Sequence, residues 1–360
     1  VIDRNVVKSA DGQGRAVTFG NAPEPSEDSM LLREREAFEA IEAGKSAATG
    51  ILYDSLEAPP DAPMTPEGVP QVIEGVRGDS HWLDIDRITA TILDPKRSPQ
   101  VSRRYWFNQI VAAEDAWCDP KHIDLCAAPD MEYEPADGWV LFFDGSKSDG
   151  STALVGCRLS DGHVVTLGIW AKPQGARGVG WIVPRTEVDE RVRHVLDAWD
   201  VKALWADPSH AKDDDSTSYW QATIDGWHQD YGRSLVLWAV AGGPNKHSTM
   251  WDMASPKRVE AFTAAAEQAE ADLRSSAEVA AAGDPEGRTV THDNHPALVA
   301  HLKHARRSPN RYGVSVWKGH RESSRKIDLA VCLIGARMLR RQFLNTTATR
   351  KTGKQAGRAW

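Results

Sequence analysis

Two aspartates each end a mostly apolar run near the middle of the chain. Residues 139–143 stop at Asp144, and residues 201–206 stop at Asp207. A helical pattern over 184–199 separates the two runs, and a right-handed helical crossover would make the second strand parallel to the first. If the strands are neighbours, about 4.8 Å apart, the two carboxylates project from one sheet edge and repel each other. A divalent cation removes that conflict, and oxygen ligands suit Mg²⁺ or Mn²⁺.

A third acid, Asp328, stands near the start of a helix predicted over 325–343. Small residues follow it and would let this helix lie close to a sheet; they are Ala330, Cys332, Gly335 and Ala336. Each aspartate alone has an ordinary alternative, since such residues cap turns and helix starts. The three in this order predict a carboxylate metal site. Gly145 and Ser146 are expected to leave room above Asp144 for metal, water and phosphate.

Basic residues crowd the approach to Asp328. The ones expected to contact DNA are Lys318, His320, Arg321, Arg325 and Lys326. Beside a metal site such residues suit phosphate contacts, and Lys326 would stabilise charge on the scissile phosphate. The alternative is a solvated loop. His301 and His304, one turn apart, are expected on a solvated or DNA-facing helix rather than in a transition-metal site.

The charge of the chain is unevenly distributed. The 360 residues carry a net charge of −8, but residues 294–360 hold 15 lysines and arginines against two acids, a net charge of +13. A basic end on an acidic protein points to an anionic partner such as nucleic acid, or to a solvated helix with a disordered tail. No apolar run reaches the roughly 18–20 residues of a membrane span. The four scattered cysteines lack a CxxC pair, which favours a reducing, intracellular compartment.

The pattern of elements predicts an α/β fold. We expect a mixed five-stranded sheet, in which three antiparallel strands are followed by parallel strands, flanked by helices. The strands are expected at 139–144, 151–158, 163–171, 201–209 and 234–240. The helices that follow the first three strands are expected at 184–199, 216–232, 250–282, 295–307 and 325–343.

The N-terminal third has a different organisation. We expect strands over 15–22 and 50–58, a helix over 24–44 capped by Ser26 or Asp28, and a helical pattern over 82–117. Residues 118–137 have turn composition and are predicted to be a linker. The sequence thus divides into a first part over 1–117, that linker, a second domain over 138–345 and a disordered basic tail over 346–360.

Four stretches in order resemble the RNase H-like nuclease superfamily and, more narrowly, the nuclease domain of the large terminase subunit of tailed bacteriophages. They are "LFFDGSKSDGSTALVG", "ALWADPS", "THDNHPALVAHLKHARR" and "SSRKIDLAVCLIGA". Two earlier stretches, "VTFGNAPEPSEDSMLLREREAFEA" and "QVSRRYWFNQIVAAEDAW", look like the end of a terminase ATPase domain and the segment leading to the nuclease. The resemblance implies that residues 1–117 are the C-terminal remnant of a P-loop ATPase domain.

The resemblance also implies an activity. The chain would be an endonuclease that cuts concatemeric double-stranded viral DNA during packaging, with Asp144, Asp207 and Asp328 holding two Mg²⁺ or Mn²⁺ ions roughly 3.5–4 Å apart. Its partners would be a small terminase subunit, a portal protein and further copies in a motor ring, at a procapsid in the host cytoplasm. The alternatives are a non-catalytic part of the motor that binds DNA or the portal, and a resolvase or transposase on the same fold. The N-terminal segment argues against the latter.

The chain has no credible phosphate-binding loop. Such a loop reads G-x-x-x-x-G-K-[ST] after a strand. The only candidate, "EAIEAGKS" over 39–46, has Glu39 where the first glycine is required, and a predicted helix precedes it. ATP hydrolysis by this chain alone is therefore not expected.

Overall fold

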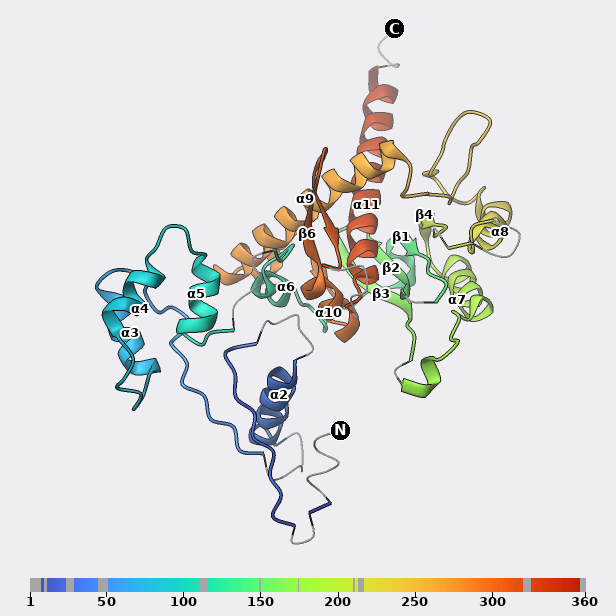
Figure 1. Cartoon of the computed structure of the whole chain (residues 1–360). Coiled ribbons are helices and arrows are strands. Elements are labelled where there is room, and N and C mark those ends of the chain that lie inside the picture. Colours follow the sequence, from blue (N-terminus) through green and yellow to red (C-terminus); the bar gives the residue numbers. More distant parts are fainter. Residues whose placement is uncertain are drawn as a thin grey trace. The chain divides into compact units, whose positions relative to one another are not determined.

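The chain forms two units, residues 1–114 and residues 115–360 (Figure 1). A computed structural model describes residues 8–9, 12–23, 29–44, 51–110, 115–148, 150–173, 175–209, 211–212, 217–319 and 325–356.

The described part of the first unit is helical. Its helices are α2 (Met30–Glu42), α3 (Gly68–Val76), α4 (Ile85–Ile92) and α5 (Pro99–Trp106). The Ser29 side chain caps α2 by accepting the Leu32 N–H at 3.1 Å. The expected caps Ser26 and Asp28 lie outside the described residues. The described residues of the two predicted strands, 15–22 and 51–58, are irregular, so this part of the prediction was wrong.

A five-stranded mixed sheet is the centre of the second unit. Its strands are β1 (Trp139–Asp144), β2 (Thr152–Arg158), β3 (His163–Trp170), β4 (Val201–Asp207) and β5 (Thr291–His292). The spatial order is β4-β1-β2-β3-β5, with β1, β2 and β3 antiparallel and β4 parallel to β1. The three antiparallel strands and the parallel fourth strand are as predicted, and β1 is an inner strand with β4 on one side and β2 on the other.

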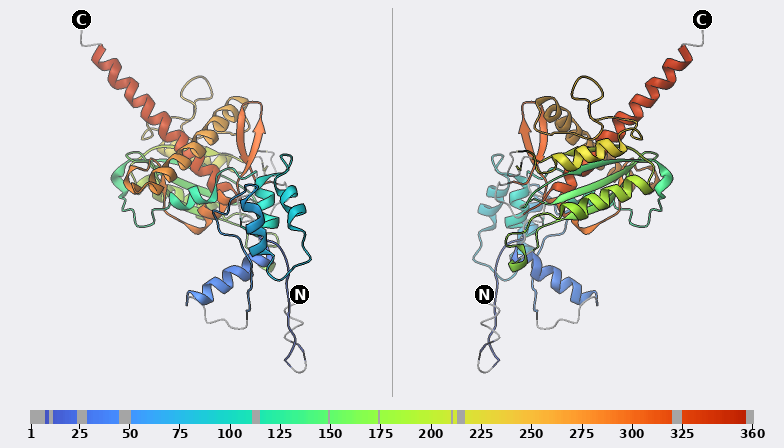
Figure 2. Two further views of the ribbon diagram at one scale, coloured as in Figure 1. Left: turned by 90° about the vertical axis from the view of Figure 1, so that its left-hand side faces the viewer. Right: turned by 90° about the vertical axis from the view of Figure 1, so that its right-hand side faces the viewer.

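Helices cover both faces of this sheet (Figures 1 and 2). On one face lie α7 (Arg185–Ala198) and α8 (Gln221–Tyr231), which enclose a core with Leu141 and Phe143. On the other lie α6 (Pro120–Leu125), α9 (Pro256–Ala281), α10 (Pro296–His304) and α11 (Asp328–Ala356), around Val140 and Phe142. Because alternate residues of β1 enter opposite cores, the strand is apolar throughout.

The fifth strand is not where the sequence predicts it. Residues 234–240 are irregular; the Val236 N–H reaches the Lys202 carbonyl at 2.7 Å, but no ladder along β4 follows. Within this run Leu235 is buried in the core on the α7 and α8 side, while Val236 is 46% exposed. The fifth strand is instead the two-residue β5, parallel to β3 on the opposite edge. A hairpin of β6 (Arg306–Asn310) and β7 (Gly313–Trp317) was also not predicted.

The segment predicted to be a linker, 118–137, belongs to the core of the second unit. Ile123 of α6 is fully buried, and the Ala128 N–H donates to the His292 carbonyl at 2.8 Å. The turn-like composition has a local cause: Asp119 caps α6, and Pro120 occupies its first position. The boundary between the units therefore lies before Asp115 rather than within 118–137.

The last helix, α11, packs along the sheet and then continues beyond the predicted domain end. Gly335 lies against the Phe142 ring so closely that a β-carbon there would collide with it. The helix extends to Ala356, so most of the predicted disordered tail is helical, while 357–360 lie outside the described residues. Elongating an already formed helix adds one hydrogen bond per residue, which favours this continuation. Neither α11 nor any other described helix has the length and apolar character to cross a membrane.

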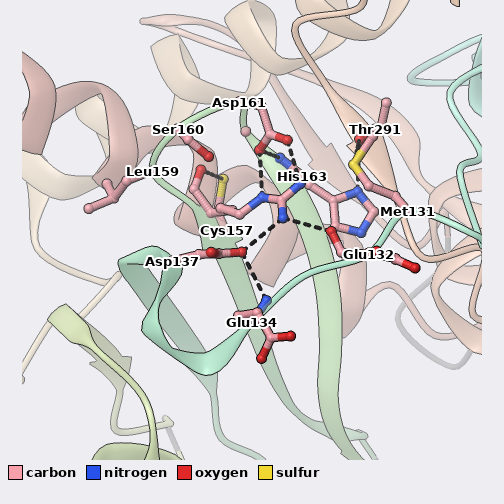
Figure 3. Close-up of polar contacts among 12 residues, drawn as sticks. Met131, Glu132, Glu134, Asp137, Cys157, Leu159, Ser160, Asp161, His163 and Thr291 are labelled. Carbon is pink, nitrogen blue, oxygen red and sulfur yellow. Dashed lines mark hydrogen bonds and ion pairs between the residues drawn. The ribbon is translucent and has the colours of Figure 1, made fainter. Parts of the chain in front are cut away.

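A buried arginine, Arg158, fixes the end of the sheet opposite to Asp144. Figure 3 shows the residues around it, among them Glu132, Asp137 and Asp161. Arg158, at the end of β2, donates to both carboxylate oxygens of Asp161, at 3.0 and 2.6 Å. It also donates to Asp137 and to the Glu132 carbonyl, each at 2.9 Å. The hydrogen bond with Asp161 is the main cause that raises the pKa of Arg158. This one side chain ties residues 132–137 to the sheet.

Lowering the pH from 7.5 to 5 should destabilise the fold through His163, the first residue of β3. Burial lowers the pKa of His163 to about 4 from 6.5, so the unfolded chain binds more protons between these values. Stability is therefore complete above about pH 6.5 and falls as the pH decreases towards 4, by about 1–2 kcal/mol at pH 5. Urea unfolding across this range measures the slope. The variant His163→Gln should make this slope less steep, since other buried histidines such as His301 also contribute to it. An unchanged slope would exclude a contribution from His163.

Candidate active site

Asp144 and Asp207 are brought together by strand register. Each is the last residue of its strand, and they are direct partners in the parallel pairing of β1 with β4. Parallel neighbours lie about 4.8 Å apart, so both carboxyl groups belong to one edge of the sheet. Asp207 is 7% exposed, and its Oδ1 accepts the Met253 N–H at 2.8 Å. Asp144 and Asp207 are therefore neighbours on adjacent parallel strands, as the sequence predicts.

Asp328 reaches the same edge from the first position of α11. Its carboxylate accepts the N–H of Ser151, which immediately precedes β2, at 3.2 Å. A hydrogen bond to α10 fixes the start of α11: the Nδ1 atom of His301 accepts the Leu329 N–H at 3.0 Å. His304 Nδ1 also lies 3.2 Å from the Lys326 carbonyl. Two histidines therefore help to fix where the third acid stands.

The three carboxyl groups share one electrostatic environment. Burial raises the pKa of Asp144 well above its usual value, and the charges of Asp328 and Asp207 raise it further. Burial also raises the pKa of Asp328, against the opposing effects of the Ser151 N–H and of Lys326 and Lys318. In an ordinary buried acid, burial alone raises the pKa. At Asp144 the like charges of Asp328 and Asp207 raise the pKa further.

The donor set fits a hard divalent cation in type. Carboxylate oxygens are the ligands that Mg²⁺ and Mn²⁺ prefer. However, no three His, Cys, Asp or Glu side chains within the described ranges form a ready coordination group. One oxygen of Asp207 and one of Asp328 are engaged by backbone N–H groups.

Close packing against Trp220 explains why residue 145 is a glycine. A β-carbon at Gly145 would collide with the ring of Trp220, whose Nε1 donates to the Ser146 carbonyl at 2.9 Å. The indole occupies the space beside this glycine and fixes the loop after Asp144. The sequence could not reveal this contact, because Trp220 is 75 residues further along the chain.

The predicted phosphate-contacting residues are only partly described. Lys318 and Lys326 lie close enough to Asp328 to lower its pKa, as expected for cations at this site. Arg325 lies in the same short segment before α11. His320 and Arg321 lie outside the described residues. The prediction that these five side chains contact DNA remains a prediction.

The prediction that His301 lies on a solvated or DNA-facing helix was wrong. His301 is buried, and burial lowers its pKa to about 3, so it is neutral and accepts the Leu329 N–H. His295 Nδ1 accepts the Ala297 N–H and caps α10. His292 Nε2 lies 2.9 Å from the Ile123 carbonyl. These rings contact backbone groups. Their spacing in the sequence nevertheless resembles that of exposed or metal-binding histidines.

Sequence reasoning also missed an aromatic and cationic stack beside Asp207. The rings of Trp205 and Trp251 are stacked, with centroids 4.2 Å apart and planes 10° from parallel. The Arg258 guanidinium carbon lies 4.6 Å from the Trp251 ring centroid. These residues come from β4, a loop and the first turn of α9, so no local pattern connects them.

The chain is similar in sequence to proteins of mycobacteriophages. No protein-family model matches it. It is 34% identical over 381 residues to the Gene 13 protein of Mycobacterium phage D29, which covers 98% of this chain. The chain spans 58% of the length of that relative.

Solved structures that resemble the chain include large terminases and their nuclease parts. The HK97 bacteriophage large terminase has 15% sequence identity and a TM-score of 0.42, over 91% of this chain and 72% of that one. The large terminase nuclease from the thermophilic phage G20c, with bound magnesium, has 14% identity and a TM-score of 0.36. That match covers 62% of this chain and 97% of the other.

Proposed function

We propose that the second unit of this chain is the metal-dependent endonuclease of a tailed-phage large terminase, which cuts double-stranded concatemeric DNA during genome packaging. The observation that carries the proposal is the register of β1 with β4, which pairs Asp144 with Asp207. Asp328 adds a third carboxyl group, whose charge is felt by Asp144. Three acids at one sheet edge, next to cations, are suited to phosphodiester hydrolysis.

Each residue has a distinct task in this proposal. Asp144, Asp207 and Asp328 would hold two Mg²⁺ or Mn²⁺ ions, which when bound supply Lewis-acid activation of water and stabilise charge on the phosphate. Lys318 and Lys326 would attract the DNA backbone and offset its charge. The buried strands β1 and β4 keep two of the acids on rigid elements, so little order has to be gained when substrate arrives.

The remaining assignments extend the same proposal. Residues 1–117 would be the end of an ATPase domain, without ATP hydrolysis of their own. A small terminase subunit, a portal protein and further copies of the chain in a motor ring would be its partners, at procapsids in the host cytoplasm. None of these is needed for the cleavage chemistry, so the nuclease can be tested alone.

A second candidate is a non-catalytic part of the packaging motor that binds DNA or the portal. The basic segment before α11 serves this candidate equally well, because backbone binding needs charge but no metal.

Supercoiled plasmid distinguishes the two candidates. With Mn²⁺ or Mg²⁺ the purified chain should convert it to nicked and linear forms, and excess EDTA should stop the reaction. Calcium serves as a control, because it takes oxygen ligands but adopts looser geometry than Mg²⁺. Salt-sensitive retention of intact plasmid in the presence of Mn²⁺, without any nicking, would instead support the binding candidate.

A further inference from the structure

A cavity of about 610 Å³ lies between the loop after residue 240 and the start of α9. Its lining includes Asn245, Lys246, Met250, Asp252 and Arg258. Two of these side chains are cationic and one is acidic. The roles already described for the three acids and for Lys318 and Lys326 do not involve this cavity.

Backbone contacts connect the cavity to Asp207. Met250, in its lining, bridges to Ala206, the residue before Asp207. Three residues later, the Met253 N–H donates to the Asp207 carboxylate at 2.8 Å. The charge of Asp207 is also felt by Arg258 across this short distance. The cavity is therefore adjacent to one of the three acids.

Arg258 is held in place but retains its hydrogen-bonding capacity. Its guanidinium is half-buried against Trp251, which is itself stacked on Trp205. Among the described residues it has no hydrogen-bond or ion-pair partner at contact distance; the negative charges it feels are those of Asp252 and Asp207. Burial lowers the pKa of Arg258, as expected for a cation that has lost water without gaining a bonded anion. An arginine has five N–H donors suited to phosphate.

The stack also limits what the cavity can accept. Trp205 covers one face of the Trp251 ring and Arg258 covers the other, because two groups 4.2 and 4.6 Å from the same ring cannot share a face. No free face of Trp251 remains for a nucleobase to stack on. The exposed Lys246 adds a second positive charge to the lining. These features favour a phosphate over a base.

We propose that this cavity binds a phosphate of the DNA backbone that flanks the cleaved position, with Arg258 as its main contact and Lys246 as an auxiliary one. The inference rests on the proposed nuclease function. It provides a phosphate contact next to Asp207, in addition to Lys318 and Lys326 next to Asp328. The DNA strand would thus be held on both sides of the acids.

Fluorescence anisotropy with a labelled duplex of mixed sequence tests the proposal, in EDTA so that no cleavage occurs. Arg258→Gln should weaken binding about tenfold, as for the loss of one hydrogen-bonded charge. It should also reduce the slope of log affinity against log salt by about 1. Lys246→Gln should reduce the slope in the same direction with a smaller loss of affinity, and it leaves the tryptophan stack intact.

Arg274→Gln is the matched control. Arg274 lies on the same helix, pairs with Glu270 at 3.8 Å and is 51% exposed, so its loss should leave affinity unchanged. Thermal melting confirms that each variant is folded. Wild-type affinity and slope in both cavity variants would overturn this inference and leave the nuclease proposal standing. A wild-type chain that binds no duplex at low salt would overturn both.

Discussion

Replacement of Asp144 with asparagine should abolish DNA cleavage and at the same time stabilise the metal-free protein. Cleavage should fall by more than about 100-fold, since even residues that only support metal ligands typically cost 10- to 100-fold. Stability should rise because burial and the charges of Asp328 and Asp207 raise the pKa of Asp144 in the folded state. At neutral pH, which lies above the pKa of this group in the unfolded chain, the carboxyl group therefore opposes folding, and the neutral amide removes that opposition.

The stability gain should be on the order of 1 kcal/mol, or roughly 2–4 °C in melting temperature for a unit of this size. Calorimetry in EDTA measures it, and plasmid nicking in Mn²⁺ measures the loss of activity. Asp200→Asn is a suitable control, because Asp200 precedes β4, pairs with Lys202 and is 42% exposed. It should change neither quantity. Nicking by Asp144→Asn at the wild-type rate would refute the catalytic role of this carboxylate.

The second large effect is expected at the opposite end of the sheet, where Arg158→Met should destabilise the second unit by about 2–4 kcal/mol. The substitution preserves much of the apolar stem but removes every donor. The Glu132 carbonyl and the carboxylates of Asp137 and Asp161 would then lose their partner. Breaking a buried ion pair costs about 3–5 kcal/mol, and the partial exposure of both acids reduces the expected value.

Urea unfolding measures this loss, and Arg193→Met provides the comparison. Arg193 also contacts two carboxylates, those of Asp189 and Asp230, but its side chain is 33% exposed. Its removal should cost less than about 1 kcal/mol. Equal losses of unfolding free energy in the two variants would mean that the burial of Arg158 adds nothing to the stability of the fold. Cleavage by folded Arg158→Met should persist, because the network does not touch the three acids.

The sheet was predictable from the sequence where its strands are fully buried. Strands predicted at 139–144, 151–158 and 163–171 differ from β1, β2 and β3 by at most one residue at either end. Continuous apolar runs between turn residues leave little choice of boundary. The fourth strand was predicted two residues too long, because β4 ends at Asp207, before Pro208.

The rest of the fold depends on contacts that no local pattern records. The two-residue β5 carries too few residues to show any periodicity. Residues 234–240 have the composition of a strand, but nothing covers Val236. His301 and Arg258 have roles set by α11 and by Trp251, which are distant in sequence or belong to other elements. Pairwise tertiary contacts of this kind require coordinates.

The pairing of Asp144 with Asp207 has a consequence for how the gene can vary. Because register alone sets their proximity, the connections outside the strands can gain or lose residues without separating the two acids. A single-residue deletion inside β4 is different, because it would turn every following side chain to the opposite face. Length changes among homologous genes should therefore accumulate in the loop around 171–184 and be absent from the short windows 139–144 and 201–207.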